Sequence, residues 1–291
     1  MPPLTLGIFG YPLAHSLSPL MYEMAIEHLH LSFRFQLYEV RPQDLPAAVQ
    51  EIRAPGVHGV CVTIPHKETI APLLDGLSEE AQRVGAVNLV HRDGDRLLGH
   101  NTDGIGFLRS LREEGRLDPR DRQVLILGAG GAARAVASQL FQERVLSLTI
   151  ANRTLARAQA LATRVEELSA GVKVQAVSLG GPEVAQAAEE ADLIVNTTSL
   201  GLAHSKGGDD ALPLSPQHIR PTQVVMDLVY NPLETPFLRL ARERGAKTLG
   251  GLGMLIYQGA ENFRIWTGSE LPVELVRPRM EAALKEAAHG A

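Results

Sequence analysis

The sequence predicts an α/β protein built from two domains, and three observations support this. The chain has 291 residues, about twice the usual domain length of ~150 residues. Its composition, 45% hydrophobic and 21% charged residues, is that of an ordinary globular protein. Short apolar strands alternate with helical segments, a pattern typical of parallel sheets with helices on both faces. We therefore expect an N-terminal domain at residues 1–103, a second domain at residues 104–250, and C-terminal helices at residues 251–291 that pack back on the first domain.

Composition also argues against several classes of protein. The net charge of −5 disfavours a nucleic-acid-binding protein, which would need a basic face. The single cysteine, Cys61, excludes an internal disulfide and a cysteine-rich metal cage, and it favours a reducing compartment. The first residues lack the pattern of a signal peptide, and no run approaches the ~18 apolar residues of a membrane helix. We expect a soluble, cytoplasmic protein that binds neither nucleic acid, membrane nor metal.

The first hundred residues alternate between strand and helix patterns. Apolar or alternating runs predict three strands, at residues 4–9, 33–38 and 57–64. Ser18 followed by Pro19 predicts a helix start with Ser18 as the N-cap. The pair Asp93-Gly94 is typical of a two-residue hairpin turn, so a short strand is expected on each side of it.

From Gly104 onward the alternation becomes more regular. Strands are predicted at residues 123–127, 147–151, 172–177, 192–195, 224–228 and 247–249. A helix is expected at residues 131–142, and most other segments between strands have helical patterns. This order is typical of a Rossmann-like, doubly wound parallel sheet. The glycine-rich stretch 203–211 is expected to form a surface loop or lid.

A glycine-rich turn follows the first strand of the second domain. Residues 124–134 read Val-Leu-Ile-Leu-Gly-Ala-Gly-Gly-Ala-Ala-Arg. A strand, a tight turn and a helix start form the context of a dinucleotide site, because a backbone without side chains lets a pyrophosphate approach the helix N–H groups. The alternative is a tight turn without a ligand. We favour the nucleotide, since both the strand and the helix are predicted.

The end of the next strand indicates which nucleotide is bound. An NAD site usually carries Asp or Glu there to bind the ribose hydroxyls. This chain instead has Asn152, Arg153 and Thr154, followed by Arg157. Two guanidinium groups without a carboxylate suit a 2′-phosphate, so NADP(H) is favoured over NAD. The alternative is a solvated helix start with Thr154 as its N-cap.

Several polar residues of the first domain stand where a purely structural segment would not place them. Asn88 interrupts an apolar run, and an amide within a strand is disfavoured. The others follow loops or strand ends: Ser16, Ser18, Thr63, Lys67 and Asp103. Taken singly, each has a structural explanation, such as a helix cap or a surface lysine.

Together these segments resemble the shikimate dehydrogenase family. The resemblance covers nearly the whole chain in the family's order, at residues 16–19, 62–67, 85–88, 101–104, 128–132, 152–154 and 251–255. Several motifs in order are far more specific than one glycine turn. The resemblance implies an NADP-dependent oxidoreductase that interconverts 3-dehydroshikimate and shikimate, on the route to chorismate and aromatic amino acids.

The resemblance also implies roles for individual residues. Lys67 and Asp103 would be the catalytic pair. With them, the substrate's carboxylate and hydroxyls would be held by Ser16, Ser18, Thr63, Asn88, Tyr230 and Gln258. The cofactor would be held by Glu79, Gly128, Ala129, Gly130, Gly131, Ala132, Asn152, Arg153, Thr154, Arg157, Leu228 and Gly251. No metal is implied, and a homodimer is the assembly considered.

The chemistry of ketone reduction suits these roles. It requires a hydride and a proton for the new alkoxide. Lys67 can donate that proton, and its charge can stabilise the oxyanion. Asp103 can hold the ammonium and hydrogen-bond an adjacent hydroxyl. Hydroxyl and amide side chains match a polyol, because a buried donor without its partner disfavours the wrong analogue.

Two positions depart from the family's pattern. The family usually has Asn where this chain has Cys61, and Leu228 stands where some members have Met. Strand alternation places Cys61 on the same side as Thr63, away from the valines beside it, so a weak thiol donor replaces an amide near the pocket. The serine pair at positions 16 and 18 favours shikimate over quinate.

Three other interpretations fit parts of the sequence. A hydrolase would use Cys61 or Ser16 with His66 or His15, but Cys61 lies in an apolar run and neither serine is in a G-x-S-x-G elbow. A non-catalytic nucleotide-sensing protein would not need both Lys67 and Asp103. The third alternative stays within the family: a quinate, aminoshikimate or otherwise divergent dehydrogenase.

Overall fold

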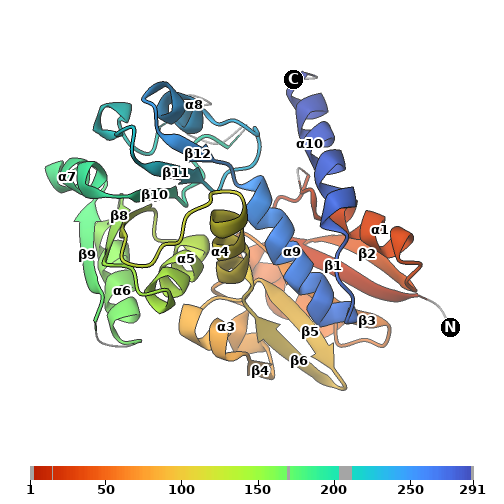
Figure 1. Cartoon of the computed structure of the whole chain (residues 1–291). Helices are drawn as coiled ribbons and strands as arrows, with labels where there is room; N and C mark the ends of the chain where they lie inside the picture. The colour runs from red at the N-terminus through yellow and green to blue at the C-terminus, as the bar shows by residue number, and fades with distance from the viewer. Residues whose placement is uncertain (1–2, 15, 169–170, 203–211, 290–291) are drawn as a thin grey trace. The chain divides into compact units, whose positions relative to one another are not determined.

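The computed structural model of the chain describes residues 3–14, 16–168, 171–202 and 212–289 (Figure 1). The chain divides into two compact units. Unit 1 comprises Met1–Asp103 and Ile256–Ala282, and unit 2 comprises Gly104–Leu255 and Ala283–Ala291. The return to unit 1 occurs inside helix α9 (Leu252–Thr267). The stretch 203–211, predicted as a loop or lid, lies outside the described residues.

Unit 1 is built on a mixed sheet with the strand order β2-β1-β3-β5-β6-β4. The strands are β1 (Leu4–Gly10), β2 (Phe33–Glu39), β3 (Val57–Val62), β4 (Gly76–Leu77), β5 (Leu89–Asp93) and β6 (Arg96–His100). β1 is parallel to β2 and β3, whereas β5 is antiparallel to β3 and β6. The helices are α1 (Ser18–His28), α2 (Leu45–Glu51), α3 (Glu79–Val84), the later part of α9 and most of α10 (Val273–His289), with 3-10 turns at η1 (Pro42–Asp44) and η2 (Ala71–Leu73).

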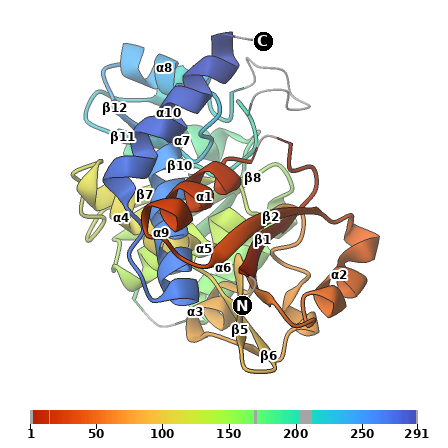
Figure 2. The same ribbon diagram turned by 90° about the vertical axis from the view of Figure 1, so that its right-hand side faces the viewer.

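The two faces of this sheet are covered by different helices. Val60 and Val62 lie in one hydrophobic cluster with residues of α2. On the other face, Tyr22 of α1 stacks on Phe263 of α9 with the ring centroids 6.3 Å apart, and Figures 1 and 2 show these two helices side by side. Cys61 Sγ lies 3.5 Å from the Tyr22 hydroxyl. The prediction that Cys61 faces away from its neighbouring valines is therefore confirmed.

Two element boundaries predicted in unit 1 were wrong: the N-cap of α1 and the end of β3. Leu17, not Ser18, is the N-cap of α1, and Ser18 is the first helical residue. The hydroxyl at the turn belongs to Ser16, whose Oγ accepts a hydrogen bond from the Ser18 backbone N–H at 3.3 Å. The strand predicted at residues 57–64 ends at Val62, because a hydrogen-bonded turn begins at Thr63.

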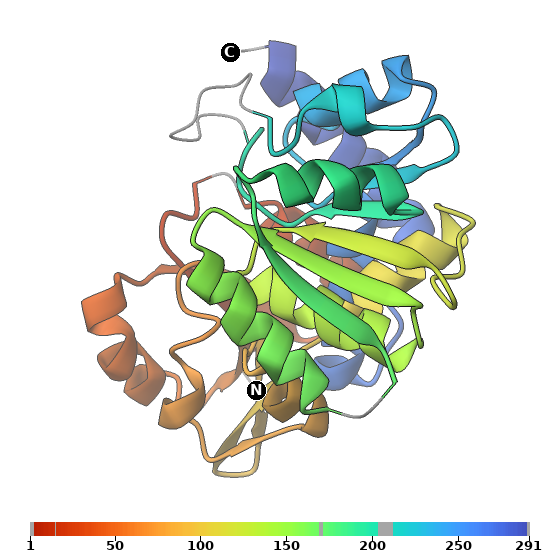
Figure 3. The same cartoon turned by 90° about the vertical axis from the view of Figure 1, so that its left-hand side faces the viewer.

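Unit 2 contains a parallel sheet with the strand order β12-β11-β10-β7-β8-β9. The strands are β7 (Gln123–Leu127), β8 (Ser147–Asn152), β9 (Lys173–Ser178), β10 (Leu193–Asn196), β11 (Val224–Asp227) and β12 (Lys247–Leu249). The helices are α4 (Asp103–Glu113), α5 (Gly131–Gln142), α6 (Leu155–Glu166), α7 (Pro182–Glu190) and α8 (Pro236–Glu243), with a 3-10 turn at η3 (Pro216–His218). Figure 3 shows α6 lying across one face of the sheet. The predicted Rossmann-like, doubly wound fold is confirmed.

Both faces of the unit 2 sheet are buried. Val124 and Ile126 of β7 lie in a cluster with residues of α5 and α6, whereas Leu125 and Leu127 lie in a cluster with residues of α7 and α8. This explains why β7 is a continuous apolar run rather than an alternating one. The winding of the chain reverses between β7 and β10. In this fold, ligands bind beyond the carboxyl ends of the strands at that reversal.

Candidate functional site

A little-exposed ion pair lies near the ends of β3 and β6 in unit 1. Lys67 Nζ is 2.6 Å from Asp103 Oδ2, and the two side chains are 19% and 5% exposed. Lys67 follows β3, and Asp103 follows β6. The structure therefore brings the two predicted catalytic residues together. A carboxylate this close to an ammonium fixes the position of a proton donor.

Asn88 holds the same carboxylate through its second oxygen. The residue is 2% exposed and stands immediately before β5. Its Nδ2 lies 2.8 Å from Asp103 Oδ1, and its Oδ1 accepts a hydrogen bond from the Thr102 backbone N–H at 2.9 Å. The buried amide thus has partners at both ends. Lys67 bonds one oxygen of Asp103 and Asn88 bonds the other, so the two contacts together hold the carboxylate in one orientation.

Helix α9 adds two amides to this network, of which the sequence analysis found only one. Gln258, one of the predicted substrate-binding residues, has its Oε1 3.2 Å from Asn88 Nδ2. Asn262, which was missed, lies one helical turn later and donates to Gln258 Oε1 at 3.1 Å. Its Oδ1 accepts a hydrogen bond from the Thr102 hydroxyl at 2.7 Å. The available signal was a polar residue four positions after Gln258, on the same helix face.

The predicted hydroxyl residues follow β1 and β3. These strands are parallel neighbours, so the segments after them leave the same edge of the sheet. The Thr63 backbone N–H donates to the Phe9 carbonyl at 2.9 Å. Ser18 is buried and Ser16 is half-buried. Within the described residues, no hydrogen bond joins these three hydroxyls to the ion pair.

Two predicted site residues lie in a different unit from most of the residues with the same predicted role. Tyr230, predicted to bind substrate, follows β11 in unit 2, and burial raises the pKa of its phenol. Glu79, predicted to contact the cofactor, is the exposed first residue of α3 in unit 1. The structure therefore divides each predicted residue set between the two units.

The geometry of Cys61 argues against the hydrolase alternative. The side chain is buried, and burial raises the pKa of its thiol to about 12. Its hydrogen-bond partners are Tyr22 and Asn262, neither of which is a base. His66 is fully buried and bonds the Val40 carbonyl through Nε2. The other histidine considered, His15, lies outside the described residues.

The glycine turn of unit 2 has the shape of a phosphate cradle. Gly128 has φ +113°, and a Cβ there would lie 2.5 Å from Thr197 Oγ1, so a side chain at this position is excluded. Gly130 is the N-cap of α5 without a side-chain cap, and Gly131 begins the helix. A Cβ at Gly130 would meet nothing within 4 Å. Helix N–H groups beside an open glycine suit a pyrophosphate. Ala129 and Ala132, the other predicted residues of this segment, complete the turn.

Two arginines follow β8, as predicted. Arg153 is exposed, and none of the ion pairs formed within the described residues includes it. Arg157 Nη2 lies 3.4 Å from the Ala129 carbonyl, which places its guanidinium against the glycine turn. Asn152 Nδ2 donates to the Thr154 carbonyl at 2.9 Å and so fixes the segment between strand and helix. This side-chain set fits a 2′-phosphate better than a pair of ribose hydroxyls.

Leu228 and Gly251 lie against each other beyond β11. A Cβ at Gly251 would collide with the Leu228 carbonyl oxygen, and the Gly251 N–H donates to the Val229 carbonyl at 3.3 Å. The close approach explains why a glycine stands at position 251. The structure thus places these two predicted cofactor residues at one point of unit 2.

Asp227, at the end of β11, is a buried carboxyl that the sequence analysis missed. It is fully buried, and its Oδ1 accepts hydrogen bonds from Asn196 Nδ2 at 2.8 Å and from the Val229 backbone N–H at 3.1 Å. Its Oδ2 accepts a hydrogen bond from the Thr235 hydroxyl at 2.7 Å. Burial nevertheless raises the pKa of this carboxyl to about 6. The side chain anchors the loop that begins with Leu228.

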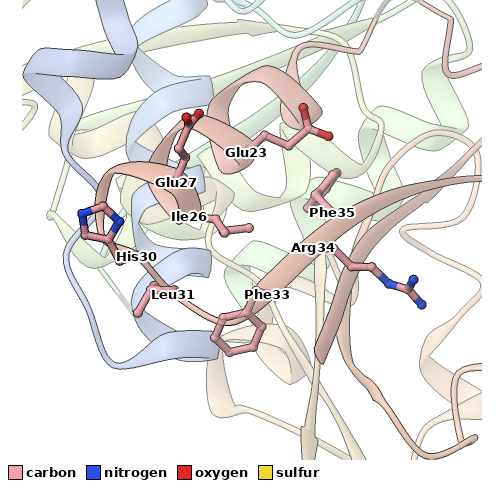
Figure 4. Close-up of a pocket in the computed structure, with 8 residues that line it drawn as sticks. All are labelled: Glu23, Ile26, Glu27, His30, Leu31, Phe33, Arg34 and Phe35. Atoms are coloured by element: carbon pink, nitrogen blue, oxygen red, sulfur yellow. The ribbon is translucent and has the colours of Figure 1, made fainter. Parts of the chain in front are cut away.

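An open hollow on another part of unit 1 contains none of the predicted residues. It has a volume of about 460 Å³ and lies between α1 and β2 (Figure 4). Its lining residues are Glu23, Ile26, Glu27, His30, Leu31, Phe33, Arg34 and Phe35. Within the described ranges, no group of His, Cys, Asp and Glu could hold a metal ion, and no helix is long and apolar enough to cross a membrane.

Comparison with protein families gives three matches along the chain. Residues 8–90 match the shikimate dehydrogenase substrate binding domain. Residues 112–205 match shikimate / quinate 5-dehydrogenase. Residues 251–281 match the shikimate 5′-dehydrogenase C-terminal domain. The matches follow the same order as the motifs in the sequence.

Individual relatives are similar over nearly their whole length. The shikimate dehydrogenase (NADP(+)) of Geobacter metallireducens is 44% identical over 96% of both chains. The shikimate 5-dehydrogenase of Thermus thermophilus, solved with NADP(H) and shikimate, is 39% identical with a TM-score of 0.84, over 98% of this chain and 99% of that one. The quinate dehydrogenase of Corynebacterium glutamicum, solved with NAD, is 31% identical with a TM-score of 0.86, over 96% of this chain and 99% of that one.

Proposed function

The chain belongs to the shikimate dehydrogenase family, and from this premise we propose that it reduces 3-dehydroshikimate to shikimate with NADPH, reversibly, with Lys67 and Asp103 as the proton-transfer pair. The observation that carries the assignment of residues is the 2.6 Å contact between Lys67 Nζ and Asp103 Oδ2. The reaction belongs to the pathway that leads to chorismate and aromatic amino acids.

Each unit has its own task in this proposal. Unit 1 carries most of the residues that bind the substrate, and unit 2 carries most of those that bind NADP(H). The cradle at Gly128 to Gly130 takes the pyrophosphate, and Arg153 and Arg157 take the 2′-phosphate. Glu79, Ala129, Gly131, Ala132, Asn152, Thr154, Leu228 and Gly251 complete the cofactor site. The open space at Gly130 and the exposed guanidinium of Arg153, which takes part in none of the ion pairs within the described residues, support this assignment.

The reaction needs two transfers to the ketone. When bound, NADPH supplies the hydride. Lys67 gives its proton to the new alkoxide oxygen and stabilises the charge that develops there. Asp103 holds the ammonium in place and hydrogen-bonds a neighbouring hydroxyl of the substrate. In the reverse direction, Lys67 accepts the proton of the hydroxyl that is oxidised.

The remaining predicted residues recognise the substrate. Ser16, Ser18, Thr63, Asn88, Tyr230 and Gln258 offer hydroxyl and amide groups for its carboxylate and hydroxyls. An analogue that leaves one of these groups unpaired in the site is stabilised less in its transition state. Within this set, the pair Ser16 and Ser18 favours shikimate over quinate.

The competing function is quinate oxidation. It is considered because one similar protein is the quinate dehydrogenase of Corynebacterium glutamicum, solved with NAD. Initial rates with shikimate and with quinate, each with NADP and with NAD, separate the two. We expect the highest kcat/KM with shikimate and NADP. A higher value for quinate, or for NAD, would overturn the assignment of substrate or of cofactor.

The proposal also covers where the enzyme is located in the cell and how many copies of the chain assemble. We place the enzyme in the cytoplasm, which suits its single free cysteine, Cys61. A homodimer is the assembly that we propose, since β2 is an edge strand with Leu37 46% exposed. Sedimentation equilibrium tests the dimer, and a single monomeric species at micromolar concentration would exclude it.

A further inference from the structure

We propose that Asn262 is a positioning residue, whose buried amide orients both Gln258 and, through Thr102 and Asn88, the carboxylate of Asp103. The proposal deepens the function proposed above and rests on it. Asn262 is fully buried. It lies at the meeting point of α9, α1 and the end of β6, and bonds side chains from all three. None of the family motifs quoted from the sequence includes it.

The Thr102 hydroxyl is the first link between Asn262 and Asp103. It has one proton to donate and three acceptors nearby. Asn262 Oδ1 is the closest at 2.7 Å, against 3.3 Å for Asn88 Oδ1 and 3.4 Å for the Gln258 carbonyl. When Thr102 donates to Asn262, its oxygen is available to accept from Asn88 Nδ2 at 2.9 Å. Asn262 therefore directs the Thr102 hydroxyl proton away from Asn88, so that the Thr102 oxygen faces Asn88 Nδ2 as an acceptor.

Asn88 transmits the orientation to the ion pair. Its Oδ1 accepts from the Thr102 backbone N–H, which fixes which end of the amide carries the N–H groups. Its Nδ2 then donates to its two closest acceptors, Thr102 Oγ1 at 2.9 Å and Asp103 Oδ1 at 2.8 Å, whereas the third acceptor, Gln258 Oε1, lies at 3.2 Å. Since Lys67 bonds the other oxygen of Asp103, the chain of bonds runs from Asn262 to the proposed proton donor.

The amide nitrogen of Asn262 has a second role. It lies 3.1 Å from Gln258 Oε1 and 3.2 Å from the Tyr22 hydroxyl, so its two protons have two good acceptors. Cys61 Sγ, at 3.5 Å, is a weaker third. A flipped amide would set two acceptor oxygens against each other at Gln258 and would deprive the Thr102 hydroxyl of its closest acceptor. The network therefore admits one orientation of Asn262, and that orientation fixes Gln258.

The neighbourhood explains why this amide matters in this chain. The side chain facing it from β3 is the thiol of Cys61, a poor hydrogen-bonding group. The pKa values of Cys61 and Tyr22 are both raised, chiefly by burial, so both groups stay neutral. Asn262 is thus the strong donor and acceptor at this junction. A buried group that loses such a partner carries the full penalty of desolvation.

Three variants test the proposal. Asn262→Leu keeps the size and removes both hydrogen-bonding functions, and we expect kcat with shikimate to fall about tenfold to a hundredfold, with KM for NADP unchanged. Asn262→Asp reproduces the amide when its carboxyl is protonated, but sets an anionic oxygen against Gln258 Oε1 when it is ionised. Its activity relative to the wild type should therefore recover as the pH falls. Thr5→Val, which removes a buried hydroxyl that accepts a hydrogen bond from Arg34 elsewhere in unit 1, is the matched control and should keep wild-type kinetics.

The outcomes separate this proposal from the one it rests on. A wild-type protein inactive with shikimate and NADP would overturn the proposed function. An active wild type with Asn262→Leu within twofold of it would show that Asn262 does not position the pair. If Asn262→Leu does not fold, Asn262→Asp decides: a pH-independent ratio to the wild type contradicts the proposal. Urea unfolding and NADPH titration of each variant show whether a lost rate reflects lost folding.

Discussion

At the scale of single residues, the strongest test falls on Lys67. Its only ion-pair partner among the described residues is Asp103, and no other lysine or arginine within them contacts that carboxylate. Lys67→Ala should therefore lower kcat by about 10²- to 10⁴-fold, the usual contribution of a positioned general acid. The dissociation constant of NADPH, measured by fluorescence titration, should stay close to wild type, because the glycine turn lies in the other unit.

The control for this variant is Lys173→Ala, which removes an exposed lysine of β9. It should leave kcat unchanged. Near-normal turnover of Lys67→Ala would show that Lys67 is not the proton donor, even if the KM for the substrate had risen.

Arg153 offers a second test at this scale, on the choice of cofactor. An exposed guanidinium just beyond β8 can bind a 2′-phosphate that NAD lacks. Arg153→Ala should raise KM for NADP about tenfold, the effect of losing one charge-assisted contact, and leave KM for NAD nearly unchanged. Steady-state kinetics with both cofactors at saturating shikimate give the comparison. Equal increases for NADP and NAD would contradict the assignment of the 2′-phosphate to this residue.

At the scale of elements, the sequence predicted those strands whose core faces are long and apolar. β7 and β11 are buried on both faces and contain uninterrupted runs of four and three apolar residues, so their positions followed from the local sequence pattern. β4 consists only of Gly76 and Leu77, and two residues have no periodicity to detect. Its pairing with β6 depends on the tertiary structure. The end of β3 was misplaced for a related reason, since a turn can begin within an apolar run.

Three histidines lie on adjacent strands of unit 1 and predict its response to acid. His58 of β3 and His91 of β5 have ring centroids 5.4 Å apart, and His91 and His100 of β6 are 6.2 Å apart. Burial lowers the pKa of both His91 and His100, and the charges of the other histidines lower that of His91 further. Asp93 opposes the shift at His91, and Glu80 and Glu261 oppose it at His100.

A lowered folded-state pKa means that the unfolded chain binds protons first as the pH falls. The stability contributed by neutral His91 and His100 is therefore present above about pH 6.5 and is lost as the pH falls through their folded values. The double variant His91→Gln/His100→Gln should show a smaller loss of unfolding free energy between pH 7.5 and pH 5.5 than the wild type, measured by urea denaturation followed by circular dichroism. Equal losses would show that these histidines are not the groups that respond.

At the scale of the whole molecule, the sequence identified the residues of the ion pair and Asn88 beside it, but not Asn262, which orients Asn88 through Thr102. Lys67, Asn88 and Asp103 stand in recognisable local motifs. Asn262 bonds Tyr22 across 240 positions and Thr102 across 160, and no local pattern encodes either contact. The same holds for Asp227, whose partner Asn196 comes from a neighbouring strand. Local motifs can thus specify which groups react, whereas their orientation depends on contacts that only folding creates.

The acid response of the whole chain combines contributions of opposite sign from its two units. In unit 2, the pKa of Asp227 is raised from 3.8 to about 6, chiefly by burial. The folded state therefore holds a proton that the unfolded chain has already lost between these two values. The stability that Asp227 contributes is full below about pH 4 and is lost as the pH rises through 6. At ~1.4 kcal/mol for each pH unit, this loss amounts to about 3 kcal/mol.

Asp227→Asn isolates this contribution, because an amide has no proton to lose and can still accept from Asn196 and Val229. The difference in unfolding free energy, wild type minus variant, should fall by about 3 kcal/mol as the pH rises from 4 to 7. The histidines of unit 1 are present in both proteins and cancel from this difference, so its slope reports on Asp227 alone. Urea denaturation across this pH range, followed by circular dichroism, provides the measurement. Two parallel stability curves would mean that Asp227 titrates near its ordinary pKa, and that the loop after β11 is anchored by an ionised carboxylate whose three hydrogen bonds offset its burial.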